Sequence, residues 1–411
     1  KDIGYSVLKT QIGKKEYKSL SSAVIYGPNA SGKTNIISAI EVFKSIVLRG
    51  NIKNGDYVFV SANEAAKNLE LIPNLLLDTP QPVEFEIKFI ENDVLYQYGI
   101  KIDLGVFLNG EYNRKILNET LLVNEKMIFL RDTSLKIGNI DDVSGMLIAA
   151  FDKKASENMA QSNLNDEELF LTGLFKSLYS SQIANNITNW FKDKCNVFLR
   201  ANFMMVSPNA DNIKANHTYI DNILQKAIKH FGIHGNEIVY IKSKESGEMS
   251  PYSILSDGKA IPVDVFESYG TERFLNIFPL IVRALQTGAT LIIDEFDASV
   301  HPMALMSIIG AFHNDEINKK GAQLIFNTHN PIFLNKNIFR RDEIKFVDRD
   351  DDTGISHHYS LSDFGTSGPN GVRNTEDYMK NYFINRYGSI RNIDFSDILE
   401  EEMESVMNEE S

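Results

Sequence analysis

Hydrophobic positions along the chain form short unbroken runs in some stretches and helical repeats in others. Apolar runs at 23–26, 291–293 and 324–326 end at glycine or polar residues, a pattern typical of strands buried on both faces of a parallel sheet. Apolar residues recur at helical spacing over 36–43, directly after the first run, and again in a stretch that ends at Leu285. Strands that alternate with helices in this way predict an α/β fold.

A different pattern fills the interval between the first two runs. Residues 83–89 and 95–102 alternate between apolar and polar positions, and the polar residues 91–93 lie between them. This predicts half-buried antiparallel strands joined by a turn. Residues 140–235 carry helical patterns with a polar break at 162–166 and contain no long heptad run. We therefore expect an inserted helical lobe rather than an extended coiled-coil arm.

The nine residues after the first apolar run, Gly-Pro-Asn-Ala-Ser-Gly-Lys-Thr-Asn, fit the phosphate-loop pattern G-x-x-x-x-G-K-[ST]. Small residues let successive backbone N–H groups point inward, and the dipole of the following helix favours an anion. Lys33 would reach the β- and γ-phosphates of ATP, and the Thr34 hydroxyl would bind Mg²⁺. The residues expected to bind the nucleotide here are Gly27, Asn29, Ala30, Ser31, Gly32, Lys33, Thr34 and Asn35.

Polar residues also follow the other two apolar runs. Asp294 and Glu295 come directly after 291–293, as expected at the carboxyl edge of a parallel sheet. We predict that Asp294 holds Mg²⁺ through a water molecule and that Glu295 polarises the attacking water. His329 follows the third run and is predicted to sense the γ-phosphate.

Ser268 and Gly270 stand just before the helical stretch that ends at Leu285. Backbone N–H groups at a helix N-terminus have no partner within the helix and can bind phosphate. These two residues are therefore further candidates for nucleotide binding.

Five segments occur in the order found in ATP-binding-cassette (ABC) ATPases. They are the phosphate loop, S-x-G-T-x-R at 268–273, I-I-D-E at 292–295, S-V-H-P at 299–302 and N-T-H at 327–329. With the longer segments Y-G-P-N-A-S-G-K-T-N, L-I-I-D-E-F-D-A-S-V-H-P, F-N-T-H and R-R-D-E-I-K-F-V-D, the chain resembles the stand-alone SMC/Rad50-like ATPases of the AAA15/AAA21 group. The resemblance covers residues 20–45 and 250–390 and implies a P-loop NTPase of ABC/SMC-like type. The stretch E-S-Y-G-T departs from the transporter signature L-S-G-G-Q.

On this basis the chain divides into four parts. The N-terminal part of the ATPase domain, with an antiparallel β subdomain, is expected at 1–135, and an inserted, mainly helical lobe at 136–250. The C-terminal part of the ATPase domain is expected at 251–390, and an acidic tail at 391–411.

The resemblance also implies how the site is completed. Ser268 and Gly270 would form the signature loop, which in this group contacts the ATP of a second protomer. Ser299 and His301 would lie on the loop that links the two sites. A homodimer or a higher even-numbered oligomer is therefore expected, and ATP-driven association and release would act as a switch or clamp.

Relatives in this group suggest a role in bacterial defence. The chain is similar to the PARIS ATPase subunit and to Septu-type and overcoming-lysogenization-defect ATPases, which often accompany a separately encoded nuclease or toxin. We therefore expect a sensor or regulator subunit whose effector is another protein. Two alternatives stay open: a Rad50-like DNA-repair motor, which predicts DNA-stimulated hydrolysis and a basic groove, and an ATP-bound scaffold with slow turnover.

One element of ABC ATPases, the glutamine that senses Mg²⁺ and water, has two candidates in the sequence. Gln97 lies in the alternating stretch 95–102, where it can also face solvent. Glu119 is the alternative. The sequence favours neither.

Composition limits the remaining possibilities. The 411 residues are 43% hydrophobic and carry a net charge of −13, so the surface as a whole does not attract nucleic acid, and only a local patch could bind it. The single cysteine, Cys195, is predicted to be a buried small hydrophobe and suggests a reducing compartment. No apolar run reaches the roughly 20 residues that span a bilayer, so we expect a cytoplasmic protein without membrane contact. Solvated surface is the expectation for the acidic run 400–404 and for a mildly basic group formed by Lys226, Lys229, His230, Lys242 and Lys244.

Overall fold

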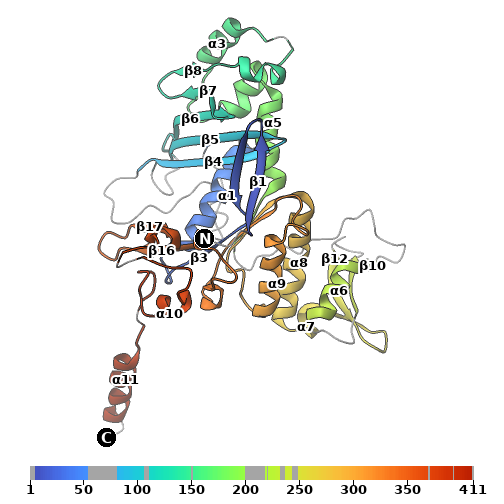
Figure 1. The fold of residues 1–411 in the computed structure, drawn as a ribbon, viewed down its shortest axis with the longest axis vertical. Coiled ribbons are helices and arrows are strands. Elements are labelled where there is room, and N and C mark those ends of the chain that lie inside the picture. The colour runs from blue at the N-terminus through green and yellow to red at the C-terminus, as the bar shows by residue number, and fades with distance from the viewer. Residues whose placement is uncertain are drawn as a thin grey trace.

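The computed structural model describes residues 5–53, 81–105, 111–149, 151–199, 218–219, 221–231, 237–242, 249–368, 371–391 and 393–409. Its centre is a six-stranded sheet with the order β17-β16-β3-β15-β14-β9 (Figure 1). The strands are β3 (Ser22–Tyr26), β9 (Cys195–Phe198), β14 (Thr290–Ile293), β15 (Gln323–Asn327), β16 (Ile344–Arg349) and β17 (Ser356–Ser360). All neighbours are parallel except β17, which is antiparallel to β16. The predicted α/β class is confirmed, since the three apolar runs of the sequence are β3, β14 and β15.

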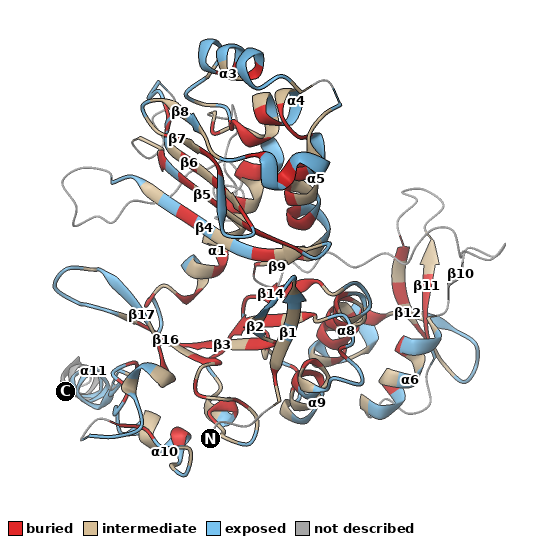
Figure 2. Ribbon diagram, turned by 45° about the horizontal axis from the view of Figure 1, so that its top comes forward, coloured by how far each residue is buried: buried red, intermediate tan, exposed pale blue. Residues whose placement is uncertain are grey.

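Helices cover both faces of this sheet. Side chains alternate between the faces along a strand, so Leu291 and Ile293 join the core formed with α8 (Tyr269–Thr287) and α9 (Pro302–His313). Ile292, between them, joins the core on the other face with α1 (Lys33–Arg49). Burial on both faces explains why these strands read as unbroken apolar runs (Figure 2).

The antiparallel β subdomain is a five-stranded sheet in simple up-and-down order. Its strands are β4 (Val83–Glu91), β5 (Val94–Asp103), β6 (Lys115–Val123), β7 (Lys126–Arg131) and β8 (Leu135–Ile137). Asn92 and Asp93, between β4 and β5, have φ angles of 51° and 60°. Two successive positive φ values suit a two-residue hairpin turn, which confirms the turn predicted at 91–93.

Short helices lie against this sheet at the top of Figure 1. They are η1 (Asp141–Met146), α3 (Lys153–Ser162), η2 (Leu171–Phe175), α4 (Lys176–Leu178), α5 (Ser181–Asn189) and η3 (Trp190–Lys194). Aromatic side chains join the helices, the sheet and α1 into one core: the ring of Phe43 lies 5.2 Å from that of Phe85 on β4 and 5.3 Å from that of Phe191. Helix α1 therefore connects the phosphate loop to the β subdomain.

The remaining elements are peripheral. They are the hairpin β1 (Val7–Ile12) and β2 (Lys15–Leu20); the sheet β10 (Thr218–Tyr219), β11 (Glu237–Lys242), β12 (Met249–Ile254) and β13 (Ala260–Pro262) with α6 (Asn222–Phe231); the short helices α7 (Val263–Phe266), η5 (Pro331–Phe333), η6 (Leu361–Phe364) and α10 (Tyr378–Phe383); and α11 (Ser396–Glu409). The α6 unit packs beside α8, whereas α11 projects away from the body (Figure 1).

The stretch 136–250 contains more strands than the helical lobe expected there. β9 pairs with β14 and forms one edge of the central sheet, and β10–β12 form a second small sheet. A boundary after residue 250 would divide β12. Strands of two to six residues are too short for the alternation of apolar and polar positions to separate them from helix. The four-part division remains a prediction, and 200–217 lie outside the described residues.

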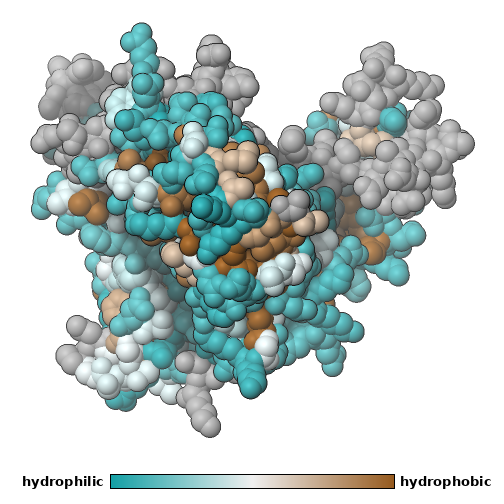
Figure 3. Space-filling view, turned by 90° about the horizontal axis from the view of Figure 1, so that it is seen from above, coloured by the Kyte–Doolittle hydropathy of each residue, from teal (hydrophilic) through white to brown (hydrophobic). Residues whose placement is uncertain are grey.

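Surface features follow the expectations from composition where they are described. Cys195 is buried, as predicted, and burial raises the pKa of its thiol to about 12. Lys226, Lys229 and His230 are exposed on α6, Lys242 on β11 is half-buried, and Lys244 lies outside the described residues. Across the described residues, none of the helices has the length and apolar character that crossing a membrane requires. Seen from above the helical lobe, the face is mainly hydrophilic, with hydrophobic side chains gathered near its middle (Figure 3).

Glu119, one of the two candidates for the glutamine position, is a buried structural residue. Its carboxylate accepts hydrogen bonds from the Tyr98 hydroxyl at 2.9 Å and from the backbone N–H groups of Phe170 and Leu171 at 2.7 and 2.9 Å. Arg131 lies 3.5 Å away as counter-charge. Burial raises the pKa of Glu119, and these hydrogen bonds and Arg131 oppose the rise. The carboxylate therefore joins β5 and β6 to the turn η2.

Replacing Glu119 should destabilise the β subdomain. Glu119→Ala leaves Arg131 and two backbone N–H groups buried without the carboxylate, so we expect a loss of about 3–5 kcal/mol in the free energy of unfolding. Urea denaturation measures it. Gln97→Ala is the control, because Gln97 is bonded to Glu86 on the exposed side of β5, and its loss should stay within about 0.5 kcal/mol. Equal stability of the two variants would contradict this role of Glu119.

Candidate functional site

The phosphate loop turns tightly from β3 into α1, and glycine is required at both of its ends. Gly32, the residue before α1, has a φ of 105°, a region that favours glycine. A Cβ on Gly27 would lie 2.3 Å from the carbonyl oxygen of Val347 on β16. On β17, the Ser356 hydroxyl donates to the carbonyl of Ser31 at 2.8 Å. The β16–β17 hairpin therefore packs directly against the loop.

Lys33 lies over the loop and binds the backbone there. Its Nζ donates to the carbonyl oxygens of Gly27 and Pro28, both at 2.8 Å. Burial lowers the pKa of Lys33 to about 8, although the nearby carboxylates of Asp294 and Glu295 raise it. Because both partners of the Lys33 ammonium are neutral carbonyls, it can exchange them for phosphate oxygens without breaking an ion pair.

Other features of the loop also fit a polyphosphate. The Ser31 hydroxyl is buried and has no hydrogen-bond partner among the described residues. The first turn of α1 contains no acidic side chain, so the positive end of the helix dipole is left for an anion. Of the remaining predicted binding residues, Asn29, Ala30 and Asn35 are exposed at the rim of the loop.

The two predicted Mg²⁺ residues are neighbours in space. The Thr34 hydroxyl donates to the Asp294 carboxylate, at 3.1 Å from Oδ1 and 3.3 Å from Oδ2, although 260 positions separate the residues in sequence. Asp294 is fully buried. A hydroxyl and a carboxylate are oxygen ligands that Mg²⁺ accepts, usually with phosphate and water completing the shell. Over the described ranges, no group of three His, Cys, Asp or Glu side chains forms a denser metal cluster.

Glu295 sits on a strained turn directly after Asp294. Its φ is 51°, and its side chain is exposed. The backbone is held from two sides, because the N–H of Glu295 donates to Asn327 Oδ1 and its carbonyl accepts from Arg273 Nη2 at 2.8 Å. A strained non-glycine residue beside a predicted binding loop is a candidate functional position.

His329 follows β15 on the exposed rim beside these groups. Partial desolvation, together with the charge of Lys33, lowers the pKa of His329, and the carboxylates of Asp297, Glu295 and Asp294 oppose this shift. The ring is therefore neutral near pH 7, with one nitrogen as donor and the other as acceptor. Lys33, Thr34, Asp294, Glu295 and His329 thus gather at the carboxyl edge of the central sheet.

The predicted signature residues Ser268 and Gly270 lie at the start of α8 and not on the phosphate loop. Ser268 caps α8, since its hydroxyl accepts from the N–H of Thr271 at 3.2 Å. Gly270 packs on the next loop, and a Cβ there would lie 2.4 Å from the carbonyl oxygen of Ser299. His301 caps α9 by accepting from the N–H of Met303. Within the described part of the chain, no hydrogen bond joins Ser268, Gly270 or Ser299 to the chain's own phosphate loop.

Two residues at the site have roles that the sequence analysis did not assign. Asn327 bonds to both Asp294 and Glu295, and Arg273 of α8 bonds to the Glu295 carbonyl. Asn327 belongs to the N-T-H segment and Arg273 to the S-x-G-T-x-R segment. In each case the sequence shows a polar residue beside an apolar neighbour, and this was the only sign that the residue has a partner in the fold. Gln97 and Glu119 both belong to the β subdomain and bond within it or to η2, so neither joins this site.

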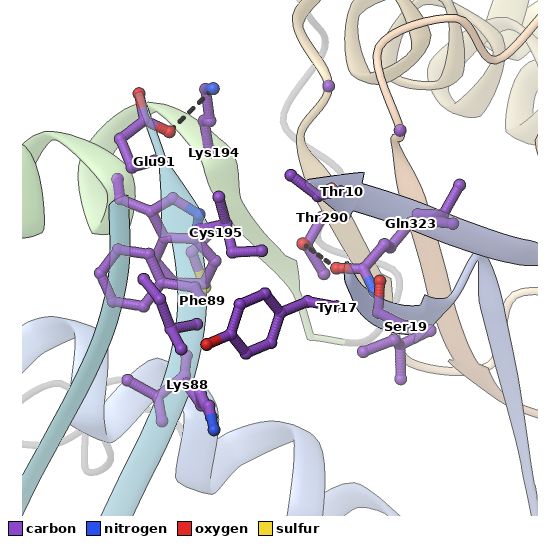
Figure 4. A pocket seen from close by; sticks show the side chains of 18 of the residues that line it. Thr10, Tyr17, Ser19, Lys88, Phe89, Glu91, Lys194, Cys195, Thr290 and Gln323 are labelled. Carbon is purple, nitrogen blue, oxygen red and sulfur yellow. Dashed lines mark hydrogen bonds and ion pairs between the residues drawn. The ribbon is translucent and has the colours of Figure 1, made fainter. Parts of the chain in front are cut away.

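A large cavity opens elsewhere in the molecule. It has a volume of about 1110 Å³ and lies among the β1–β2 hairpin, α1, β4 and the amino ends of β14 and β15 (Figure 4). Thr290 and Gln323, the first residues of β14 and β15, line it and are bonded to each other at 3.0 Å. None of the predicted nucleotide-binding residues lines this cavity.

Solved structures with a similar arrangement include heads of SMC proteins. One is an SMC head bound to the C-terminal winged-helix domain of ScpA, at 16% identity with a TM-score of 0.40, covering 87% of this chain and 97% of that one. Another is the SMC head domain from Thermotoga maritima, at 13% identity with a TM-score of 0.33, covering 86% and 96%. A third, from Pyrococcus furiosus, has 15% identity and a TM-score of 0.37, covering 87% and 96%. Scores this low carry no functional conclusion.

Sequence families give the clearer result. No curated protein matches the chain. A family model described as "AAA domain, putative AbiEii toxin, Type IV TA system" matches residues 22–169 and 204–335, which include the phosphate loop, the acidic pair and His329. These segments make up more than half of the 411 residues. The chain therefore belongs to this family of AAA-domain proteins, AAA_21.

Proposed function

We propose that the chain is an Mg²⁺-dependent ATPase whose complete sites form when two copies close around ATP. The observation that carries this proposal is the contact of Thr34 with Asp294, which brings the phosphate loop to the acidic end of β14. Lys33 and His329 lie beside this pair, and Glu295 follows it. Membership of an AAA-domain family supports the same chemistry.

In this proposal each residue at the edge of the sheet has one task. Lys33 releases the carbonyls of Gly27 and Pro28 and binds the β- and γ-phosphates. Thr34 and Asp294 hold Mg²⁺, which neutralises charge on the phosphates when it is bound. The exposed Glu295 carboxylate orients the attacking water, and the neutral His329 ring donates a hydrogen bond to the γ-phosphate.

Sharing of the site between copies is supported by the surface around Ser268. Val265 is 74% exposed and Tyr269 is 54% exposed, with Phe266 between them and Met303 exposed on α9. Exposed apolar side chains gathered around polar binding residues are typical of an interaction surface. A second copy would cover them while Ser268 and Gly270 meet its ATP.

We further propose that this cycle regulates a separate effector, a nuclease or toxin, in bacterial defence against phage. The support is the resemblance of the sequence to defence ATPases and the description of its family as containing a putative toxin of a toxin–antitoxin system. The net charge of −13 gives no support to a DNA-repair motor.

Lys33→Ala should abolish ATP binding, because it removes the charge that faces the β/γ-phosphates. Equilibrium binding of a fluorescent ATP analogue measures the affinity. Lys44→Ala is the control: Lys44 lies on the same helix, bonds to the carbonyl of Cys195 and is not at the loop. Equal affinities of Lys33→Ala and wild type would refute the phosphate-loop assignment.

Glu295→Gln should bind ATP normally and hydrolyse it about 10²–10⁴-fold more slowly, since the carboxylate that orients water is lost while the shape is kept. Phosphate release under saturating ATP measures the rate. Because this variant would stay in the ATP-bound dimer, it is also the suitable bait for a candidate effector, with Lys33→Ala as the unbound reference. Near-wild-type hydrolysis would move the catalytic role away from Glu295.

A shared site predicts complementation between two inactive variants. Gly270 is unsuitable for this test because any side chain there meets the chain's own Ser299 carbonyl. Ser268→Asp keeps a good helix cap but puts a carboxylate against the partner's polyphosphate. We expect it to bind ATP and to hydrolyse it at least tenfold more slowly.

The isosteric control is Ser268→Asn, which also caps the helix but adds no charge. Co-expression of Ser268→Asp with Lys33→Ala should recover part of the activity, because one composite site then has an intact loop and an intact signature. Full activity of Ser268→Asp at concentrations where the protein is monomeric would exclude a shared site.

A further inference from the structure

We propose that Asn327 is a positioning residue that holds the Asp294 carboxylate and the backbone of Glu295 through one side-chain amide. This inference rests on the proposed ATPase function. Asn327 is the last residue of β15 and is 1% exposed. Its Nδ2 donates to Oδ1 of Asp294, and its Oδ1 accepts from the backbone N–H of Glu295.

An amide of this length meets both demands at once. The Asp294 carboxylate accepts hydrogen bonds and the Glu295 N–H donates one, so the side chain between them must offer a donor and an acceptor. Aspartate has the same size but, when ionised, only accepts. Leucine has nearly the same shape and does neither.

The two bonds fix the parts of the site that otherwise have few restraints. Among the described residues, the other side-chain partner of the Asp294 carboxylate is the Thr34 hydroxyl, which Mg²⁺ would also engage. Glu295 lies at a φ of 51°, and the Asn327 bond holds the N–H side of that turn while Arg273 holds its carbonyl. Asn327 therefore fixes the Asp294 carboxylate directly, and it fixes Glu295 through the backbone from which its side chain projects.

The same strand end also leads to His329. Thr328 is buried between Asn327 and His329, and its N–H donates to the carbonyl of Ile25 on β3 at 3.2 Å. This bond fixes the end of β15 to the strand that precedes the phosphate loop. The side-chain bonds of Asn327 then fix the end of β14 to the end of β15. Asn327 acts through Asp294 and Glu295 and has no direct contact with substrate in this scheme.

Asn327→Leu separates positioning from binding. We expect kcat to fall by about 10²-fold, the cost of misplacing a catalytic group by about 1 Å, while KM for ATP stays within about threefold because the phosphate loop is unchanged. A second measurement needs no turnover: ATP-analogue affinity with EDTA should equal that of wild type, and the gain in affinity on adding Mg²⁺ should fall at least threefold.

Asn318→Leu is the matched control, in the loop that precedes β15. Asn318 is also a buried asparagine, whose amide donates to the carbonyls of Phe312 and Ala322 at 2.9 and 2.8 Å. Its replacement should lower thermal stability but leave kcat per folded molecule and the Mg²⁺ effect unchanged. If Asn327→Leu fails to fold, Asn327→Asp keeps the bond to Glu295 and loses the donor to Asp294, and the same loss of kcat and of the Mg²⁺ effect is expected.

The proposal is overturned if Asn327→Leu, or Asn327→Asp in its place, keeps kcat within threefold of wild type or behaves as Asn318→Leu does. It is also overturned if KM rises while kcat is unchanged, since Asn327 would then serve binding. A wild-type protein that binds ATP but does not hydrolyse it would instead refute the proposed function. In that case the Mg²⁺ effect on analogue affinity still tests whether Asn327 positions Asp294.

Discussion

The hydrogen bond from Thr34 to Asp294 is the contact on which the candidate site depends. It joins the start of α1 to the end of β14, two points 260 residues apart. A parallel sheet makes this possible, because the carboxyl ends of β3, β14 and β15 meet at one edge. Without that edge, the phosphate loop, the acidic pair and the histidine would be three unrelated segments.

The long stretch between α1 and β14 supports this edge from outside. Helix α1 carries the loop at one end and packs Phe43 into the aromatic core of the β subdomain along its length. The chain then returns to the central sheet as β9, beside β14. Helix α1 therefore gives the phosphate loop and the β subdomain a direct structural connection.

Helix α8, in the C-terminal half of the chain, contacts the segment that follows β14, and among the described residues Ser268 and Gly270 at its start make no hydrogen bond to the phosphate loop. Arg273 connects α8 to the backbone of Glu295, and Gly270 packs on Ser299. Ser268 stands at the start of the same helix, among exposed apolar side chains. In the proposed dimer, a ligand that meets Ser268 from a neighbouring copy would lie near Glu295, because Arg273 of the same helix bonds to the Glu295 carbonyl.

The sequence by itself determined the type of fold, and it predicted candidate site residues that the structure brings to one edge of the central sheet. Buried parallel strands need unbroken apolar runs, and a phosphate loop needs glycine where φ is positive or backbone approaches closely, so β3, β14, β15, Gly27 and Gly32 were predictable. Tertiary structure alone decided the roles of Asn327, Arg273 and Glu119, the place of β9 in the central sheet and the approach of β16–β17 to the loop. Each of these depends on hydrogen bonds or pairing between segments distant in sequence. A local pattern records that a residue is polar among apolar neighbours, but its partner is fixed only when the sheets assemble.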